Sequence, residues 1–275
     1  LLGSDAHQTG WCLRRQARPR GMHGAVWRGL NCFDSADSYG NRKSEQCLGN
    51  ALDGWRQSVI IATKFGKPID ESHTGARPEY VSQACNDSLA RLGTDYIDLY
   101  QLHAPDPTVP IADTLGALNE LVVAGKVREI GSSNFSGGQI AEAESSSERE
   151  HFARFASVQN HYNMLRRDDE ADAIPECERL GISYLPYFPL ESGLLTGKYR
   201  QGESAPKGTR IADGGWLAEK YTDRNLEIIQ RLIAFAGAND RTLLGLAMSW
   251  LLRFPVVRAV IAGATAPHQR HRHAA

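Results

Sequence analysis

The sequence lacks the features that define disulfide-rich, zinc-binding and membrane-spanning proteins. It has five cysteines in 275 residues, an odd number without a C-x-x-C pair, so neither a disulfide framework nor a zinc knuckle is predicted. No run approaches the roughly 20 apolar residues that a membrane-spanning helix needs. The first residues also lack the continuous apolar segment of a secretory signal. We therefore expect a soluble, cytoplasmic protein in a reducing compartment.

The sequence also has almost no net charge. It contains 31 Lys and Arg residues against 32 Asp and Glu residues, for a formal net charge of −1. This balance gives no electrostatic reason to expect a nucleic acid or an acidic membrane surface as a partner. The hydrophobic content of 41% is ordinary for a globular protein, and the length suffices for one large core. A single α/β domain is the simplest expectation.

From residue 31 onward, short β-rich runs alternate with longer helical patterns, which is typical of βαβ units around a parallel sheet. The predicted strands are 31–37, 58–65, 96–102, 127–133, 156–161, 182–188 and 256–262. The predicted helices are 44–54, 78–92, 111–124, 138–150, 169–180, 223–238 and 242–254. Seven strands are one short of an eight-stranded barrel.

Several helix ends have their own sequence signals. Pro78 is predicted at the start of a helix, where its missing N–H costs nothing. Gly93, Gly125 and Gly181 are predicted at helix ends, where a left-handed residue caps the last carbonyls. The segment 191–221, rich in Gly, Lys and Arg, has no clean period, and a loop of that length is usually functional or mobile.

Four ionisable residues lie in or just after the predicted strands: Asp34, Tyr39, Lys64 and His103. The carboxyl ends of parallel strands converge on one face, so these residues are expected to meet there. A carbonyl reduction needs a proton donor close to the carbonyl oxygen. A tyrosine can fill this role if a nearby lysine lowers its pKa from about 10. A partly buried lysine in turn needs a carboxylate partner.

Each of these residues also has a structural explanation. Asp34 alone could cap a turn, Tyr39 could pack on the surface, and His103 could be a hydrogen-bonded core histidine. Lys64 is harder to explain in this way, because it ends the apolar run VIIAT, where a lysine reaches solvent only if the strand end is open. The combination of the four favours a catalytic site.

The segments that carry these residues resemble the aldo-keto reductase family, in its bacterial type. They are FDSADSYGNRKSEQCLGNAL, VIIATKFG, RLGTDYIDLYQLHAPDPTVPIADTLGALNELVVAGKVREIGSSNFS and SVQNHYNMLRR. The resemblance covers about residues 29–267 and implies a (β/α)8 TIM barrel that uses NADPH, or less often NADH, without a metal. It implies that aldehydes or ketones are reduced by hydride transfer from the nicotinamide, with Tyr39 as proton donor. Asp34, Lys64 and His103 complete the implied tetrad.

The same resemblance implies a set of cofactor-binding residues. The nicotinamide carboxamide would be held by Ser133, Asn134 and Gln159, and its ring would stack on Tyr187. The pyrophosphate and adenosine would lie against Pro189, Leu190, Ser192, Gly193, Leu194, Lys198, Gly263, Ala264, Thr265 and Gln269. Asn and Gln amides suit a carboxamide because they both donate and accept hydrogen bonds.

The two ends depart from the family pattern. Nothing in 1–28 reproduces the family's first strand, and the basic residue expected near Ala266 is displaced to Arg270 or Arg272. The expected organisation is therefore an atypical N-terminal segment (1–28) in the place of the first strand and helix, a barrel (29–267), and a basic His/Arg tail (268–275) at a truncated C-terminus. NADPH preference is implied by the resemblance alone.

Two other functions are compatible with this reading. One is a cofactor-binding regulatory protein or a catalytically impaired barrel, as in the family's potassium-channel β-like branch. The other is a lyase that uses Lys64 as a Schiff-base nucleophile, although a neighbouring Asp34 would keep that lysine protonated. A small-molecule substrate is expected in the reductase and lyase readings.

Overall fold

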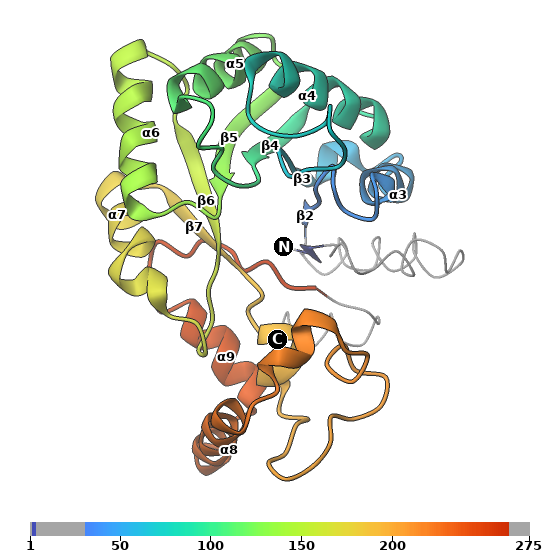
Figure 1. Cartoon of the computed structure of the whole chain (residues 1–275), viewed down its shortest axis with the longest axis vertical. Helices are drawn as coiled ribbons and strands as arrows, with labels where there is room; N and C mark the ends of the chain where they lie inside the picture. Colours follow the sequence, from blue (N-terminus) through green and yellow to red (C-terminus); the bar gives the residue numbers. More distant parts are fainter. Residues whose placement is uncertain (1, 4–30, 264–275) are drawn as a thin grey trace.

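The computed structural model describes residues 2–3 and 31–263. Its centre is a sheet of parallel strands that follow one another in sequence order. The strands are β1 (Leu2–Gly3), β2 (Cys32–Asp34), β3 (Ile60–Phe65), β4 (Ile97–Leu102), β5 (Val127–Ser133), β6 (Phe155–His161) and β7 (Ser183–Tyr187). Figure 1 shows that the sheet curls, with helices on its outer side. This arrangement confirms an α/β fold with a parallel sheet.

The helices alternate with the strands along the chain. They are α3 (Lys43–Ala51), α4 (Pro78–Leu92), α5 (Ile111–Val123), α6 (Gly137–Glu150), α7 (Ala173–Leu180), α8 (Asp223–Ala238) and α9 (Leu243–Leu251). Four 3-10 helices accompany them: η1 (Arg56–Ser58), η2 (Asp168–Ala171), η3 (Glu191–Thr196) and η4 (Gly215–Lys220). The predicted helices are confirmed to within a few residues, except that the first turns of 169–180 form η2.

The helix ends follow their sequence signals. Pro78 is the first residue of α4, and Gly93 caps that helix with a φ of 65°. Gly181 caps α7 with a φ of 68°, and Gly125 follows the cap of α5 with a φ of 72°. Left-handed backbone is unstrained only for glycine, so these positions stop each helix just before the next strand.

The two edges of the sheet are short. The segment 1–28 was expected to be the place of the first strand although its sequence shows no strand pattern, and Leu2–Gly3 pairs in parallel with β2. The predicted strand 256–262 is reduced to two isolated bridges, from Val257 to Tyr184 and from Ile261 to Tyr187. The rest of the segments 1–28 and 268–275 lies outside the described residues. Short pairings at an edge carry little periodic signal, so the first strand could not be recognised and the last was predicted too long.

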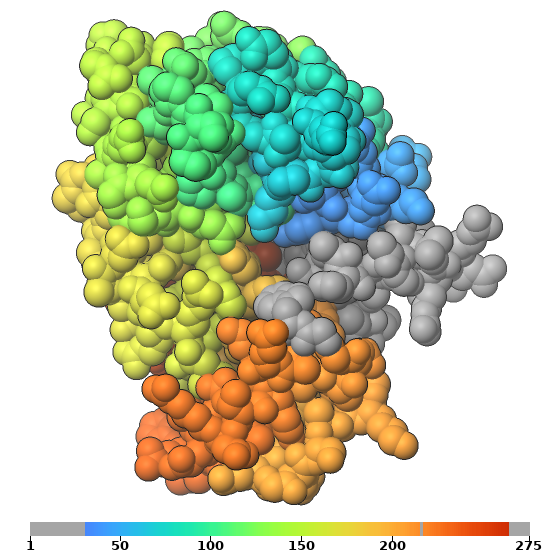
Figure 2. All heavy atoms as spheres, in the orientation of Figure 1, coloured from blue at the N-terminus to red at the C-terminus, as the bar shows by residue number. Residues whose placement is uncertain are grey.

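The apolar side chains form two cores. The larger one lies between the sheet and α3 to α7. The smaller one, called here the second core, joins η3 to α8 and α9; its members are Leu190, Leu194, Leu195, Tyr199, Ile211, Leu226, Ile229, Leu243 and Ala247. Figure 2 shows the segment after β7, in orange, as a distinct mass below the helices. The predicted loop 191–221 is therefore anchored by its own core.

Two further observations concern cysteine and membranes. Cys47 is disulfide-bonded, which the scattered cysteines did not predict, whereas Cys32, Cys85 and Cys177 are free thiols.

Across the described residues, no helix combines the length and the apolar character needed to cross a bilayer.

Gly49→Ala is expected to destabilise the protein by about 1–3 kcal/mol, the usual cost of overpacking. A Cβ at Gly49 in α3 would lie 2.3 Å from the carbonyl oxygen of Leu92, a backbone atom that cannot move alone. The matched control is Gly237→Ala in α8, where nothing lies within 4 Å and alanine should stabilise the helix by about 0.5–1 kcal/mol. Urea unfolding measures both, and equal effects would contradict the packing explanation.

Candidate active site

A buried ion pair forms the centre of the site. The Lys64 ammonium donates to Asp34 Oδ2 at 2.6 Å and to the Ser35 carbonyl at 2.8 Å. The Lys64 side chain has no exposed surface, and that of Asp34 is 2% exposed. The pairing of β2 with β3 brings the two residues together. A lysine without water needs such a partner to stay charged, so the pair places a fixed ammonium at the carboxyl ends of the strands.

Tyr39 and His103 complete the cluster. The Lys64 nitrogen lies 5.2 Å from the centre of the Tyr39 ring, and the Tyr39 and His103 rings meet edge-on at 5.5 Å. Backbone hydrogen bonds set these positions: Asp37 N–H donates to the Lys64 carbonyl, and His103 N–H donates to the Phe65 carbonyl. The structure thus brings together all four residues that the sequence singled out as a candidate tetrad.

The environment of His103 favours the neutral imidazole. Burial, followed by the charges of Lys64 and Lys67, holds the pKa of His103 well below its usual value of 6.5. Its Nδ1 is buried and has no hydrogen-bond partner among the described residues. A neutral imidazole can donate or accept a hydrogen bond but is a poor acid at pH 7.

Gln159, at the end of β6, contacts the ion pair from across the curled sheet. Its side-chain amide donates to Asp34 Oδ1 at 2.9 Å, so both carboxylate oxygens of Asp34 are engaged. The Ser133 hydroxyl donates to the backbone carbonyl of Gln159 at 2.7 Å. The ends of β2, β3 and β6 are thereby linked through one carboxylate, β5 is joined to β6 beside it, and each oxygen of the buried carboxylate accepts a hydrogen bond.

A second chain of hydrogen bonds runs from β7 to His103. The Tyr187 hydroxyl donates to Asn134 Oδ1 at 2.7 Å. The Asn134 amide nitrogen donates to the His103 carbonyl at 2.9 Å and to the Ser133 hydroxyl at 3.1 Å. Both amide hydrogens of Asn134 are therefore used within the protein. A ligand that hydrogen-bonds to this amide would have to share Oδ1 or replace the contact with Ser133.

The segment after Tyr187 has an unusual backbone. Glu191, Ser192 and Gly193 have φ values of 40°, 58° and 100°, the left-handed region that costs energy for non-glycine residues. A Cβ at Gly193 would lie 3.3 Å from the Lys198 ammonium. Partial burial and then the nearby Arg210 hold the pKa of Lys198 below its usual value. Adjacent cations beside a close-approach glycine suit an anionic ligand.

The remaining predicted cofactor residues divide into two groups. Within the segment after β7, Pro189, Leu190 and Leu194 are buried and Ser192 is half-buried. Gly263 is exposed at the end of the described range, and Ala264, Thr265 and Gln269 lie outside it. No group of three or more His, Cys, Asp or Glu residues between 31 and 263 is placed to hold a metal ion.

Two buried carboxyl groups were missed by the sequence analysis. Glu45 has no exposed surface; it accepts from Thr63 Oγ1 at 2.5 Å and from Arg91 Nε at 2.7 Å. Asp37 is 1% exposed, and burial together with the charge of Glu45 raises its pKa to about 7. A signal for Glu45 was available, because it shares the inner face of α3 with Leu48 at a three-residue spacing.

A polar cluster at the carboxyl edge of a curled parallel sheet is the arrangement found at the active sites of α/β barrel enzymes. The sequence profile of the Aldo/keto reductase family matches residues 5–274, and the chain belongs to this family. It is therefore an oxidoreductase by family. This result confirms the resemblance on which the sequence analysis relied.

Individual relatives agree with the family. The chain is 31% identical to an aldo-keto reductase of Fusarium vanettenii over 268 residues, covering 88% of this chain and 72% of that protein. It is 32% identical over 280 residues to a Schizosaccharomyces pombe protein described as a voltage-gated potassium channel subunit beta, covering 97% and 78%. A solved glycerol dehydrogenase from Gluconobacter oxydans superposes with a TM-score of 0.81 at 29% identity, covering 99% and 85%.

Asp37→Asn is expected to stabilise the protein at pH 8 but not at pH 4. The folded-state pKa of about 7 exceeds the ordinary value of 3.8, so the folded state holds the proton more tightly. Stability from this group is complete below pH 4 and is lost as the pH rises towards 7. Asparagine carries no charge, and it should recover about 2–4 kcal/mol above pH 7.

Urea unfolding at the two pH values measures this effect. The matched control is Asp53→Asn, at an exposed position. It should change the free energy of unfolding by the same small amount at pH 4 and at pH 8. A gain for Asp37→Asn of equal size at pH 4 and pH 8 would rule out the charge as its cause.

Proposed function

We propose that the chain reduces small aldehydes or ketones to alcohols with NADPH, or with NADH, at the carboxyl edge of a (β/α)8 barrel formed by residues 29–267. The supporting observation is the convergence of Lys64, paired with Asp34 at 2.6 Å, on the Tyr39 and His103 rings. This arrangement supplies a charged lysine beside a tyrosine, which is what proton delivery to a carbonyl oxygen requires.

In this mechanism Tyr39 gives its proton to the carbonyl oxygen. The Lys64 ammonium lowers the pKa of the tyrosine hydroxyl by stabilising the phenolate, and Asp34 keeps that ammonium charged. His103, neutral because it is buried, donates a hydrogen bond that orients the carbonyl. The same ion pair argues against a Schiff-base lyase, because a lysine held by a carboxylate has no free electron pair for attack.

The nicotinamide, when bound, supplies the hydride. The proposed contacts of its carboxamide are Ser133, Asn134 and Gln159, and the proposed stacking partner is Tyr187. For the phosphates and the adenosine we propose the segment from Pro189 to Leu194, Lys198, and the residues Gly263, Ala264, Thr265 and Gln269. The left-handed backbone at 191–193 and the neighbouring cations Lys198 and Arg210 fit an anionic pyrophosphate.

A second function has one specific observation in its favour. A relative at 32% identity is described as a potassium channel subunit beta. A regulatory protein of this kind would bind the nucleotide without efficient turnover. The reductase reading is better supported, because Asp34, Lys64 and His103 are buried and the half-buried Tyr39 lies against Lys64 and His103 without an evident structural need for a tyrosine there.

Tyr39→Phe is expected to lower the rate of carbonyl reduction by about 10²–10⁴-fold, the usual contribution of a general acid. NADPH affinity should stay unchanged, because Tyr39 is not among the proposed cofactor contacts. The assay follows NADPH absorbance with a panel of small carbonyls that includes glyceraldehyde, since the structural neighbour is a glycerol dehydrogenase. Glycerol oxidation is measured in the reverse direction.

The matched control is Tyr96→Phe. Tyr96 lies between Arg56 and Arg128 next to the amino end of β4, away from the site, so its loss should leave turnover unchanged. Full activity of Tyr39→Phe would refute the assigned proton donor. NADPH binding by the wild type without turnover of any carbonyl would favour the regulatory function.

A further inference from the structure

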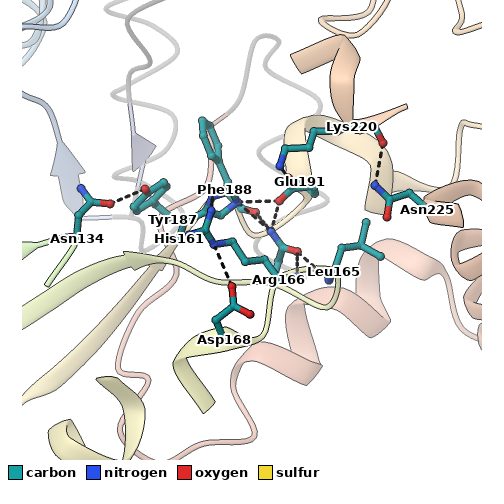
Figure 3. Close-up of polar contacts among 11 residues, drawn as sticks. Asn134, His161, Leu165, Arg166, Asp168, Tyr187, Phe188, Glu191, Lys220 and Asn225 are labelled. Atoms are coloured by element: carbon teal, nitrogen blue, oxygen red, sulfur yellow. Dashed lines mark hydrogen bonds and ion pairs between the residues drawn. The ribbon is translucent and has the colours of Figure 1, made fainter. Parts of the chain in front are cut away.

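His161 packs directly against the aromatic residue proposed to hold the nicotinamide. The two residues are paired across β6 and β7, and their rings stack with centroids 5.2 Å apart and an angle of 25° between planes. The ring of Phe188 meets His161 at 5.3 Å and Tyr187 at 5.3 Å. Figure 3 shows His161 lying between Tyr187 and Glu191. The orientation of Tyr187 is therefore set partly by His161.

His161 also holds the segment that follows Tyr187. Its Nε2 lies 2.7 Å from Glu191 Oε2, and the two side chains are only 9% and 5% exposed. The Asn163 amide nitrogen donates to the same carboxylate oxygen and to the Phe188 carbonyl. The Lys220 ammonium lies 3.8 Å from Glu191 Oε1. Figure 3 shows these contacts converging on Glu191.

The hydrogen bonds define one tautomer of His161. Arg166 Nη1 lies 3.3 Å from His161 Nδ1, and a guanidinium can only donate. Nδ1 therefore accepts, which leaves the ring hydrogen on Nε2, where it donates to Glu191. The histidine thus acts as a directional link between the guanidinium and the carboxylate, a role that an apolar ring could not fill.

Glu191 needs these donors because of its place in the chain. Burial alone would raise its pKa, but the contact with His161, the hydrogen bond from Asn163 and the charge of Lys220 hold the pKa below the usual value. The hydrogen bond from His161 acts in this direction even when the imidazole is neutral. Glu191 therefore carries a negative charge inside a segment proposed to contact pyrophosphate. The donors stabilise this charge. They also anchor the side chain next to the left-handed backbone at Glu191 and Ser192, and such backbone persists only when surrounding contacts enforce it.

We propose that His161 and Glu191 are a positioning pair, which fixes the Tyr187 ring and the backbone of residues 188–193 in the cofactor-binding conformation before the nucleotide arrives. This inference rests on the proposed function for the identity of the nucleotide. Neither residue touches the reacting atoms. Their contribution is to cofactor affinity, because an ordered site loses less conformational entropy on binding.

The test compares His161→Ala, His161→Gln and Glu191→Gln in the full chain. His161→Ala should raise the Kd for NADPH roughly tenfold, about the worth of one charge-assisted hydrogen bond. The kcat at saturating NADPH should stay within about twofold, since the transition-state contacts are intact. His161→Gln keeps an N–H donor near the Nε2 position and should restore most of the affinity. His151→Asn, at an exposed left-handed position, is the control.

A second measurement needs no cofactor. Amide hydrogen exchange of residues 188–197 should be faster in His161→Ala and in Glu191→Gln than in the wild type and in His151→Asn. Unchanged exchange and unchanged Kd in both variants would overturn the positioning role. A second result would also overturn it: a fall in the kcat of His161→Ala as large as its loss of NADPH affinity, with neither value restored in His161→Gln.

The outcomes separate this inference from the proposed function. A wild-type protein that binds NADPH but reduces no carbonyl would refute the reductase, while the Kd and exchange comparisons would still decide the role of His161. A wild-type protein that binds neither NADPH nor NADH would overturn both.

Discussion

The buried ion pair between Lys64 and Asp34 is the interaction on which the rest of the site depends. Removing one partner would leave an uncompensated charge in the core, at a cost of about 3–5 kcal/mol. The register of β2 and β3 places the two residues side by side, and Gln159 from β6 engages the second carboxylate oxygen. The geometry of the candidate site and the curl of the sheet therefore depend on one set of contacts.

Much of the fold was predictable because the local signals agreed with one another. Strands β2 to β7 were found from apolar runs, since parallel strands are buried on both faces, and α4 was delimited by Pro78 and Gly93. The second core was missed because Leu194 and Leu195 are embedded in a Gly-rich stretch without a period. Its partners in α8 and α9 lie tens of residues further along, where only packing reveals them.

The position of the candidate site was predictable from the sequence, but the hydrogen bonds between its side chains were not. The rule that strand ends converge located Asp34, Lys64 and His103 together. It could not show that Gln159 donates to Asp34 across 125 residues of sequence, or that His161 donates to Glu191 across 30. Such pairs depend on strand order and side-chain direction. The neutrality of His103 likewise follows from burial, which only the packed structure defines.

The second core is a packing unit of its own, which shares α9 with the larger core. Residues 190–247 bury their apolar side chains largely among themselves, so this unit can unfold locally while the sheet and its outer helices stay intact. A nucleotide that binds only the folded form of the segment at the start of this unit would stabilise the unit against local unfolding. If the proposed function holds, resistance of the segment after β7 to proteolysis would then rise with the concentration of that nucleotide, so that the ligand would set the lifetime of the segment that binds it.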